Sequence, residues 1–160
     1  MNEEIKIKKL DNKNIKAIVN WCKDKDADFL MQWAGAGYIY PLTEEQISKR
    51  LYDGAQIFEA QLNGEIAGTV EIIHREEQYN SALIGRFVID PSITSKGIGT
   101  KIMLEFLEYC KEKLGISEVS LCVFDFNIGA YKCYQKCGFT ETGSATRPNG
   151  WKAITMRKTL

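Results

Sequence analysis

Two glycines lie where a predicted strand gives way to a long predicted helix. Residues 89–102 read IDPSITSKGIGTKI, which places Gly97 and Gly99 at the start of the helix. The first N–H groups of a helix have no intrahelical acceptor, and glycine lets a ligand approach the backbone closely. The junction therefore suits a phosphate or pyrophosphate group. A tight turn that binds no ligand is the alternative.

The loop does not match the two common nucleotide-binding motifs. A P-loop has Gly-Lys-Ser/Thr after four intervening residues, and this sequence lacks it. A dinucleotide-binding loop has a third glycine where Ile102 stands. Both nucleotide classes are therefore excluded by the loop sequence.

A second motif follows about thirty residues later, in the segment NIGAYKCYQKCGF of residues 127–139. The combination of VIDPxxxxxGxG with NxxAxxxYxxxGF resembles the GNAT superfamily of acetyl-CoA-dependent N-acetyltransferases. The match extends from Phe87 to Phe139, and the elements before and after it agree with the family. The resemblance implies an α/β fold with a mixed, mostly antiparallel sheet flanked by helices. It also implies that strands four and five of that sheet splay apart and hold acetyl-CoA between them.

The resemblance also implies roles for particular residues. The backbone of Phe87, Val88 and Ile89 is expected to lie along the pantetheine and acetyl group, with the N–H of Val88 or Ile89 stabilising the oxyanion. The residues expected around the pyrophosphate are Thr94, Ser95, Lys96, Gly97, Ile98, Gly99 and Thr100. The first of these is usually Arg or Gln in the family, so Lys96 is an alternative source of attraction for phosphate.

Two residues of the second motif receive roles in the same way. Asn127 is expected to contact the cofactor, and Tyr134 to lie near the thioester sulfur and protonate the departing thiolate. Each has a structural alternative: Asn127 could cap a helix without contacting the cofactor, and Tyr134 could pack in the core without a catalytic role. The resemblance requires no metal.

The general base is less well defined by the sequence. A primary amine with a pKa near 10.4 is neutral in only about one molecule in 2,500 at pH 7, so a proton must leave before or during attack. Glu71 in GTVEII is the preferred carboxylate, with pairing to Arg86 or exposure to solvent as its alternatives. His74, Asp125 and a chain of water molecules remain open as other bases.

The acceptor site is predicted in the aromatic segment FLMQWAGAGYIY of residues 29–40. Trp33 and Tyr38 are the predicted contacts, and Tyr38 is preferred because the run Gly35-Ala36-Gly37 before it suggests a mobile loop. Acidic residues just upstream could attract a cationic acceptor: Asp24, Asp26 and Asp28. A core stripe of aromatic residues beside a solvated acidic face is an equally good interpretation.

The elements that must position these residues follow from periodicity. Alternation predicts strands at residues 5–10, 56–62, 66–74 and 82–90, with Asn63-Gly64 as a hairpin turn between the second and third. Helical spacing predicts helices after Asp11, around 29–33, and over 44–51, 97–114 and 128–136. Further strands are expected at 118–124, 139–142 and 151–157. The alternation of strand and helix after residue 82 implies a parallel crossover.

Composition limits the remaining classes of function. The chain has 160 residues, 44% of them hydrophobic, which suits one domain over residues 1–160. Lys plus Arg and Asp plus Glu both number 21, so the neutral chain does not favour nucleic acid or an anionic membrane. No apolar run approaches the ~20 residues of a spanning helix, and we expect a cytoplasmic protein. Five cysteines with one histidine favour buried thiols over disulfides or a metal site.

The sequence thus predicts an enzyme that transfers the acetyl group of acetyl-CoA to a primary amine of a small molecule, peptide or protein by direct attack in a ternary complex. The alternative is a non-catalytic module of the same fold that binds acyl-CoA as a regulatory ligand. The oligomeric state is expected to be monomer or homodimer.

Overall fold

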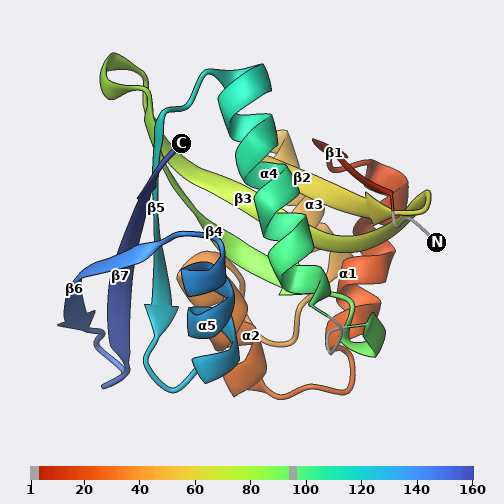
Figure 1. Ribbon diagram of the computed structural model, residues 1–160. Helices are drawn as coiled ribbons and strands as arrows, with labels where there is room; N and C mark the ends of the chain where they lie inside the picture. The colour runs from red at the N-terminus through yellow and green to blue at the C-terminus, as the bar shows by residue number, and fades with distance from the viewer. Residues whose placement is uncertain (1–3, 94–96) are drawn as a thin grey trace.

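A mixed sheet runs through the whole molecule, in a computed structural model that describes residues 4–93 and 97–160 (Figure 1). Within these residues seven strands are ordered β1-β2-β3-β4-β5-β7-β6. The strands are β1 (Ile5–Lys9), β2 (Gln56–Leu62), β3 (Glu65–Glu76), β4 (Ser81–Ile89), β5 (Glu118–Phe124), β6 (Thr140–Thr146) and β7 (Lys152–Thr159). The β4–β5 pair is parallel and the other pairs are antiparallel. The mixed α/β fold predicted from the sequence is confirmed.

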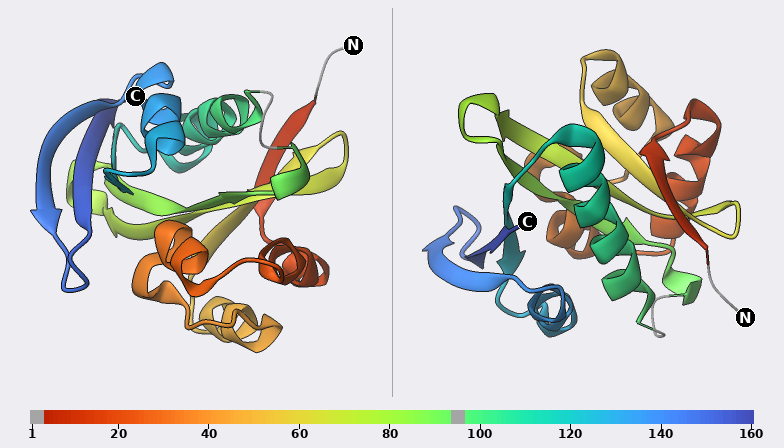
Figure 2. Two further views of the ribbon diagram at one scale, coloured as in Figure 1. Left: turned by 90° about the horizontal axis from the view of Figure 1, so that it is seen from below. Right: turned by 45° about the horizontal axis from the view of Figure 1, so that its top comes forward.

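Helices cover both faces of this sheet (Figure 2). They are α1 (Ile15–Cys22), α2 (Ala27–Ala34), α3 (Glu44–Tyr52), α4 (Ile98–Leu114) and α5 (Ile128–Lys136). The first three lie on one face, and α4 and α5 lie on the other. No described helix combines the length and apolar character needed to cross a bilayer.

Each face buries its own apolar cluster. Phe58 and Val70 of the sheet pack with Phe106 of α4 and Tyr134 of α5 on one side. On the other side Ile18, Leu30 and Ile47 of α1, α2 and α3 form a second cluster with Val88 of β4. The amphipathic helices bury the stripes that their periodicity predicted.

Strands β4 and β5 stay paired over only a short stretch. Parallel pairing joins Ser81 to Glu118, Ala82 to Val119 and Leu83 to Ser120. Beyond Leu83 the two described strands are no longer paired. The register of β4 against β3 is also interrupted between Thr69 and Glu71 of β3, opposite the part of β4 where Arg86 has a φ of 49°. The two strands therefore separate after the first third of β4, as the resemblance implied.

Several element bounds differ from the sequence prediction. Asp11 caps a short 3₁₀ turn over Asn12–Asn14, so α1 begins only at Ile15. The last two strands are longer than predicted. The sequence did not indicate the full length of β6, because all residues of this strand are exposed and form no apolar pattern. Its extended state depends on pairing with β7. The Asn63-Gly64 turn is confirmed, and both residues have positive φ.

Candidate acyl-transfer site

A cleft of about 520 Å³ opens between the separated ends of β4 and β5, and we call it the interstrand cleft. Its lining comes from both faces of the sheet, with α2 on one side and the first residues of α4 together with α5 on the other. Seven of the residues predicted for the site line this cleft: Trp33, Phe87, Val88, Ile89, Gly99, Asn127 and Tyr134. The tertiary structure thus brings both sequence motifs to one place.

The start of α4 forms one wall of the cleft. Gly97 precedes the helix with a φ of 71° and provides no side-chain cap, so the first N–H groups have no acceptor within the helix. A Cβ on Gly99 would lie 3.0 Å from Ile89 Cδ1 and 3.7 Å from Cys133 Sγ, so a larger residue would crowd this wall. Thr94, Ser95 and Lys96 fall outside the described residues.

Two other residues of the predicted loop do not line the cleft. Ile98 is buried with Ile102 in a small cluster beneath the helix. Thr100 is half-buried and donates a hydrogen bond from Oγ1 to Cys133 Sγ at 3.6 Å. Both residues hold the helix in place through their side chains.

The backbone geometry of β4 distinguishes the two candidate oxyanion donors, the N–H groups of Val88 and Ile89. Asp90 N–H donates to Ala67 O of β3 at 2.8 Å, and Val88 pairs with Thr69 of the same strand. Successive N–H groups of a strand point to opposite edges, so the Val88 N–H points toward β3 and the Ile89 N–H toward β5. Of the two donors, Ile89 is therefore the one that faces the opening.

Tyr134 lies on α5 with its ring against two other aromatic residues. Its centroid is 6.4 Å from that of Phe87 and 6.0 Å from that of Phe139. Burial raises the pKa of the Tyr134 hydroxyl, so the group keeps its proton throughout the usual assay range. Asn127 accepts a hydrogen bond from Ala130 N at 3.3 Å, and thus caps α5 while it lines the cleft.

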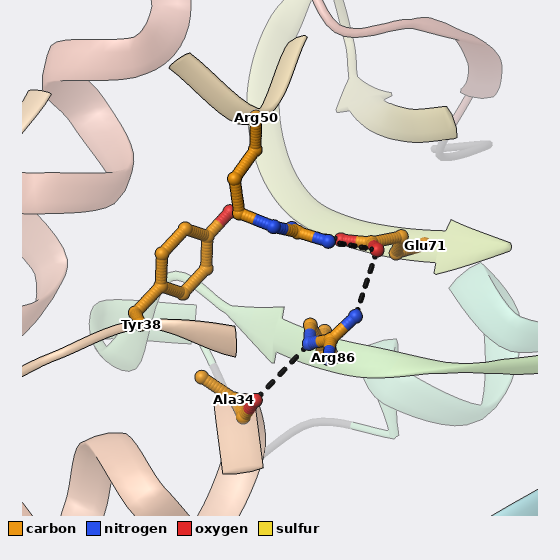
Figure 3. A network of polar contacts seen from close by, with 5 residues as sticks. All are labelled: Ala34, Tyr38, Arg50, Glu71 and Arg86. Carbon is orange, nitrogen blue, oxygen red and sulfur yellow. Dashed lines mark hydrogen bonds and ion pairs between the residues drawn. The ribbon is translucent and has the colours of Figure 1, made fainter. Parts of the chain in front are cut away.

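Glu71 is bound on both carboxylate oxygens by arginines (Figure 3). Arg50 donates from Nη1 to Oε1 and from Nη2 to Oε2, each at 2.5 Å, and Arg86 donates from Nη1 to Oε2 at 2.8 Å. The hydrogen bonds to this carboxylate raise the pKa of the Arg50 guanidinium above its already high value. Guanidinium donors thus occupy both carboxylate oxygens of Glu71, which fits the structural alternative better than the role of general base.

The other candidate bases also lie away from the cleft. His74 is exposed, with its Nε2 2.7 Å from Glu76 Oε1. Asp125 is exposed, and its N–H donates to Lys152 O. Neither these two residues nor Glu71 lines the interstrand cleft. Among the bases considered, a water chain is the one that this geometry leaves.

The two predicted acceptor contacts have different surroundings. Trp33 is partly buried and lines the cleft. Tyr38 is buried with its ring 5.2 Å from the Arg50 guanidinium, and Arg50 Nη1 donates to its hydroxyl at 3.3 Å. Of the two residues, Trp33 is thus the one that lines the cleft, whereas the Tyr38 side chain packs against Arg50.

The three aspartates around the start of α2 do not line the cleft. Asp26 caps the helix by accepting from Phe29 N at 2.9 Å, and Asp24 and Asp28 are exposed. The charged residues in the cleft lining are Lys25 and Arg86. Sequence reasoning considered Arg86 only as a partner of Glu71, because nothing in a strand pattern indicates that a bulge turns one residue toward an opening.

A second cleft of about 590 Å³ lies between α3 and β3, on the Arg50 side of the arginine pair. Its lining mixes acidic and basic residues and includes Glu71. No residue of the glycine loop or of the NxxAxxxYxxxGF motif lines it. The described residues contain no group of three or more His, Cys, Asp or Glu placed to hold a metal ion.

The splayed strands, the glycine turn at the start of α4 and the buried Tyr134 in the opening are the features that the resemblance to the GNAT superfamily implied. The comparison with known families agrees, since residues 15–139 match the family described as "Acetyltransferase (GNAT) family". The chain belongs to this family.

The chain is also similar to individual relatives and solved structures. It is 28% identical over 103 residues to the L-amino acid N-acetyltransferase of Escherichia coli. The aligned region covers 62% of this chain and 63% of that protein. The spermidine N-acetyltransferase of Vibrio cholerae, solved with CoA and spermine, superposes with a TM-score of 0.79 at 19% identity and covers 97% of this chain and 95% of its own. The ribosomal-protein-S5-alanine acetyltransferase of Vibrio fischeri gives 0.77 at 17%, with 99% and 94% covered. These structures establish the fold.

Proposed function

We propose that this protein transfers the acetyl group of acetyl-CoA to a primary amine by direct attack in a ternary complex. The observation that carries the proposal is the interstrand cleft, which joins the start of α4, the backbone of β4 and Tyr134 in one opening through the sheet. Acetyl-CoA would supply an activated thioester, and family membership supports its use.

The start of α4 would hold the pyrophosphate. The N–H groups of its first turn and the positive end of the helix dipole attract an anion, and Gly97 and Gly99 have no side chain to cover the backbone. Asn127 and Gly129 on the opposite wall complete the channel that leads toward Tyr134. The described loop residues thus fit a diphosphate.

Two groups of the chain would act on the reacting atoms. The N–H of Ile89 would donate to the carbonyl oxygen as negative charge develops there. The Tyr134 hydroxyl, kept neutral by its raised pKa, would give its proton to the departing sulfur. A water chain would carry the amine proton to solvent, because the candidate carboxylates lie outside the cleft.

The alternative is a module that binds acyl-CoA without turnover. Release of free thiol from acetyl-CoA across a panel of primary amines separates the two functions. Enzyme activity predicts amine-dependent release that saturates with acetyl-CoA. Tight binding of acetyl-CoA in calorimetry, with no release for any amine, would instead establish the binding module.

The wider setting of the activity also belongs to this proposal. We expect a small-molecule or peptide amine as the acceptor, with no role for nucleic acid or membrane, and a cytoplasmic monomer or homodimer. The balanced charge of the sequence supports the first part, since 21 basic residues face 21 acidic ones.

A further inference from the structure

The helices that contribute to the lining of the interstrand cleft lie on opposite faces of the sheet, with α2 on one face and α4 and α5 on the other (Figure 2), so we divide the cleft into two halves. The half beside α4 and α5 is the one proposed for acetyl-CoA. The half beside α2 is lined by Lys25, Phe29, Gln32, Trp33 and Arg86. This second half is open to an acceptor that approaches from the other face.

The charge of the α2 half is positive. Lys25 and Arg86 are the only charged residues in the described lining of the whole cleft, and no acidic residue belongs to it. Asp24, Asp26 and Asp28 are close to Lys25 in the sequence but do not line the cleft, and Asp26 caps α2. A polyamine or another multiply charged cation would find no carboxylate in this half.

Arg86 is held in place from three directions. Its Nε donates to Ala34 O at 3.1 Å, and its Nη1 donates to Glu71 Oε2 at 2.8 Å. The backbone of Gly37 lies so close that a Cβ there would be 2.3 Å from Nε. The φ of 49° at Arg86 is uncommon for a residue other than glycine, and such backbone outliers concentrate at functional sites. The guanidinium is therefore preorganised at the cleft.

One end of this guanidinium remains available. Among the described residues, no hydrogen bond involves Nη2, and the side chain is 19% exposed. Glu71 does not neutralise the pair, because one carboxylate faces the two guanidinium groups of Arg50 and Arg86 (Figure 3). The network keeps a net positive charge, with donors of the kind that bind carboxylates.

We propose that the acceptor carries a carboxylate beside its amine, as a free amino acid does, and that Arg86 binds this carboxylate with help from Lys25. The inference rests on the proposed acetyl transfer for the fate of the amine. With the carboxylate on Arg86, an apolar substituent would lie against Phe29 and Trp33, and the amine would face the opening between β4 and β5.

Binding measurements on matched probes test this selection. L-leucine and L-phenylalanine are each compared with their amides and with the decarboxylated amines 3-methylbutylamine and 2-phenylethylamine, and spermidine is added as a polycation. Calorimetry on protein saturated with CoA is expected to show binding of the amino acids about 10-fold to 100-fold tighter than of their amides, the effect of a charged hydrogen bond.

Three variants assign the effect to the cleft. Arg86→Gln should remove the preference for the acid over the amide, and Arg86→Lys should retain part of it. Lys25→Gln should reduce the preference in the same direction, and its exposed position protects this test from a folding defect. Lys23→Gln, an exposed neighbour outside the interstrand cleft, is the matched control and should change nothing.

Binding and turnover separate this inference from the proposed function. Selective binding of the amino acids that depends on Arg86 supports the inference even if no thiol is released, in which case acetyl transfer alone fails. Thiol release that is as fast with spermidine or the decarboxylated amines, and indifferent to Arg86→Gln, overturns the inference and leaves acetyl transfer intact. Equal binding of acid and amide, or binding of no probe, also overturns it.

Discussion

At the scale of single residues, Tyr134 is the group that we propose to protonate the leaving thiolate. Tyr134→Phe keeps the ring contacts with Phe87 and Phe139 and removes only the hydroxyl. We expect kcat to fall about 10²–10⁴-fold, the usual contribution of general acid catalysis, with little change in the KM for acetyl-CoA. Steady-state kinetics under conditions where chemistry limits the rate measures this.

The matched control is Tyr131→Phe on the same helix. The Tyr131 hydroxyl donates to Glu141 Oε2 at 3.4 Å, and Tyr131 does not line the cleft.

The pH dependence gives a second test of Tyr134. Because burial raises the pKa of Tyr134, loss of its proton should cause no fall in rate up to about pH 10, the ordinary tyrosine pKa. An unchanged kcat in Tyr134→Phe would make this tyrosine a packing residue.

Glu71 gives a second residue-scale prediction, because its two possible roles have different consequences. Glu71→Gln leaves Arg50 and Arg86 without their shared carboxylate, and the free energy of unfolding should fall by about 3 kcal/mol. A general base would instead lose activity at unchanged stability. Urea denaturation and thiol release are measured together, with exposed Glu65→Gln on the same strand as control.

At the scale of elements, the start of α4 is the proposed binding site for the cofactor pyrophosphate. Gly99→Asp places a carboxylate beside the free N–H groups, where it favours the helix dipole but repels a phosphate. We expect weaker acetyl-CoA binding in calorimetry and a retained circular dichroism spectrum. Gly143→Asp on exposed β6 adds the same charge, with nothing near the new side chain, and should bind normally. Unchanged affinity in Gly99→Asp would exclude α4 from the site.

The segment that follows α2 has a different role from the helix itself. Trp33→Ala alters the cleft lining and should raise the acceptor KM selectively. Tyr38→Ala removes a buried ring beneath Arg50 and should lower stability by about 3–5 kcal/mol and affect both substrates. Melting temperatures and both Michaelis constants distinguish these outcomes. A selective acceptor defect in Tyr38→Ala at normal stability would reverse the assignment.

At the scale of the whole molecule, a ligand in the interstrand cleft would contact elements on both faces of the sheet. Binding to the folded state alone should raise the free energy of unfolding by about 2.7 kcal/mol at a ligand concentration of 100 Kd. Thermal melts with increasing acetyl-CoA should therefore shift upward in the parent and in Gly143→Asp. They should shift much less in Gly99→Asp, and an equal shift in all three would place the cofactor elsewhere.

Much of this fold could be predicted from local patterns. The Asn63-Gly64 turn, the amphipathic stripe of α4 and the order of strands and helices depend on neighbours in sequence, and each was found as predicted. The glycine loop and the NxxAxxxYxxxGF motif also indicated residues that meet in space, since Gly99, Asn127 and Tyr134 line one cleft. Spacing carries this information because backbone conformation and helix faces repeat with fixed periods.

Other features depend on contacts between residues far apart in the chain. The sequence by itself indicated a strand with Glu71 and a nearby Arg86, but only the tertiary structure added Arg50 from α3 and made the carboxylate a structural partner. It likewise buried Tyr38, exposed the aspartates around the start of α2 and placed the cationic Arg86 in the lining of the interstrand cleft. Periodicity determines which face a residue occupies, whereas the charges that meet across that face are decided by packing.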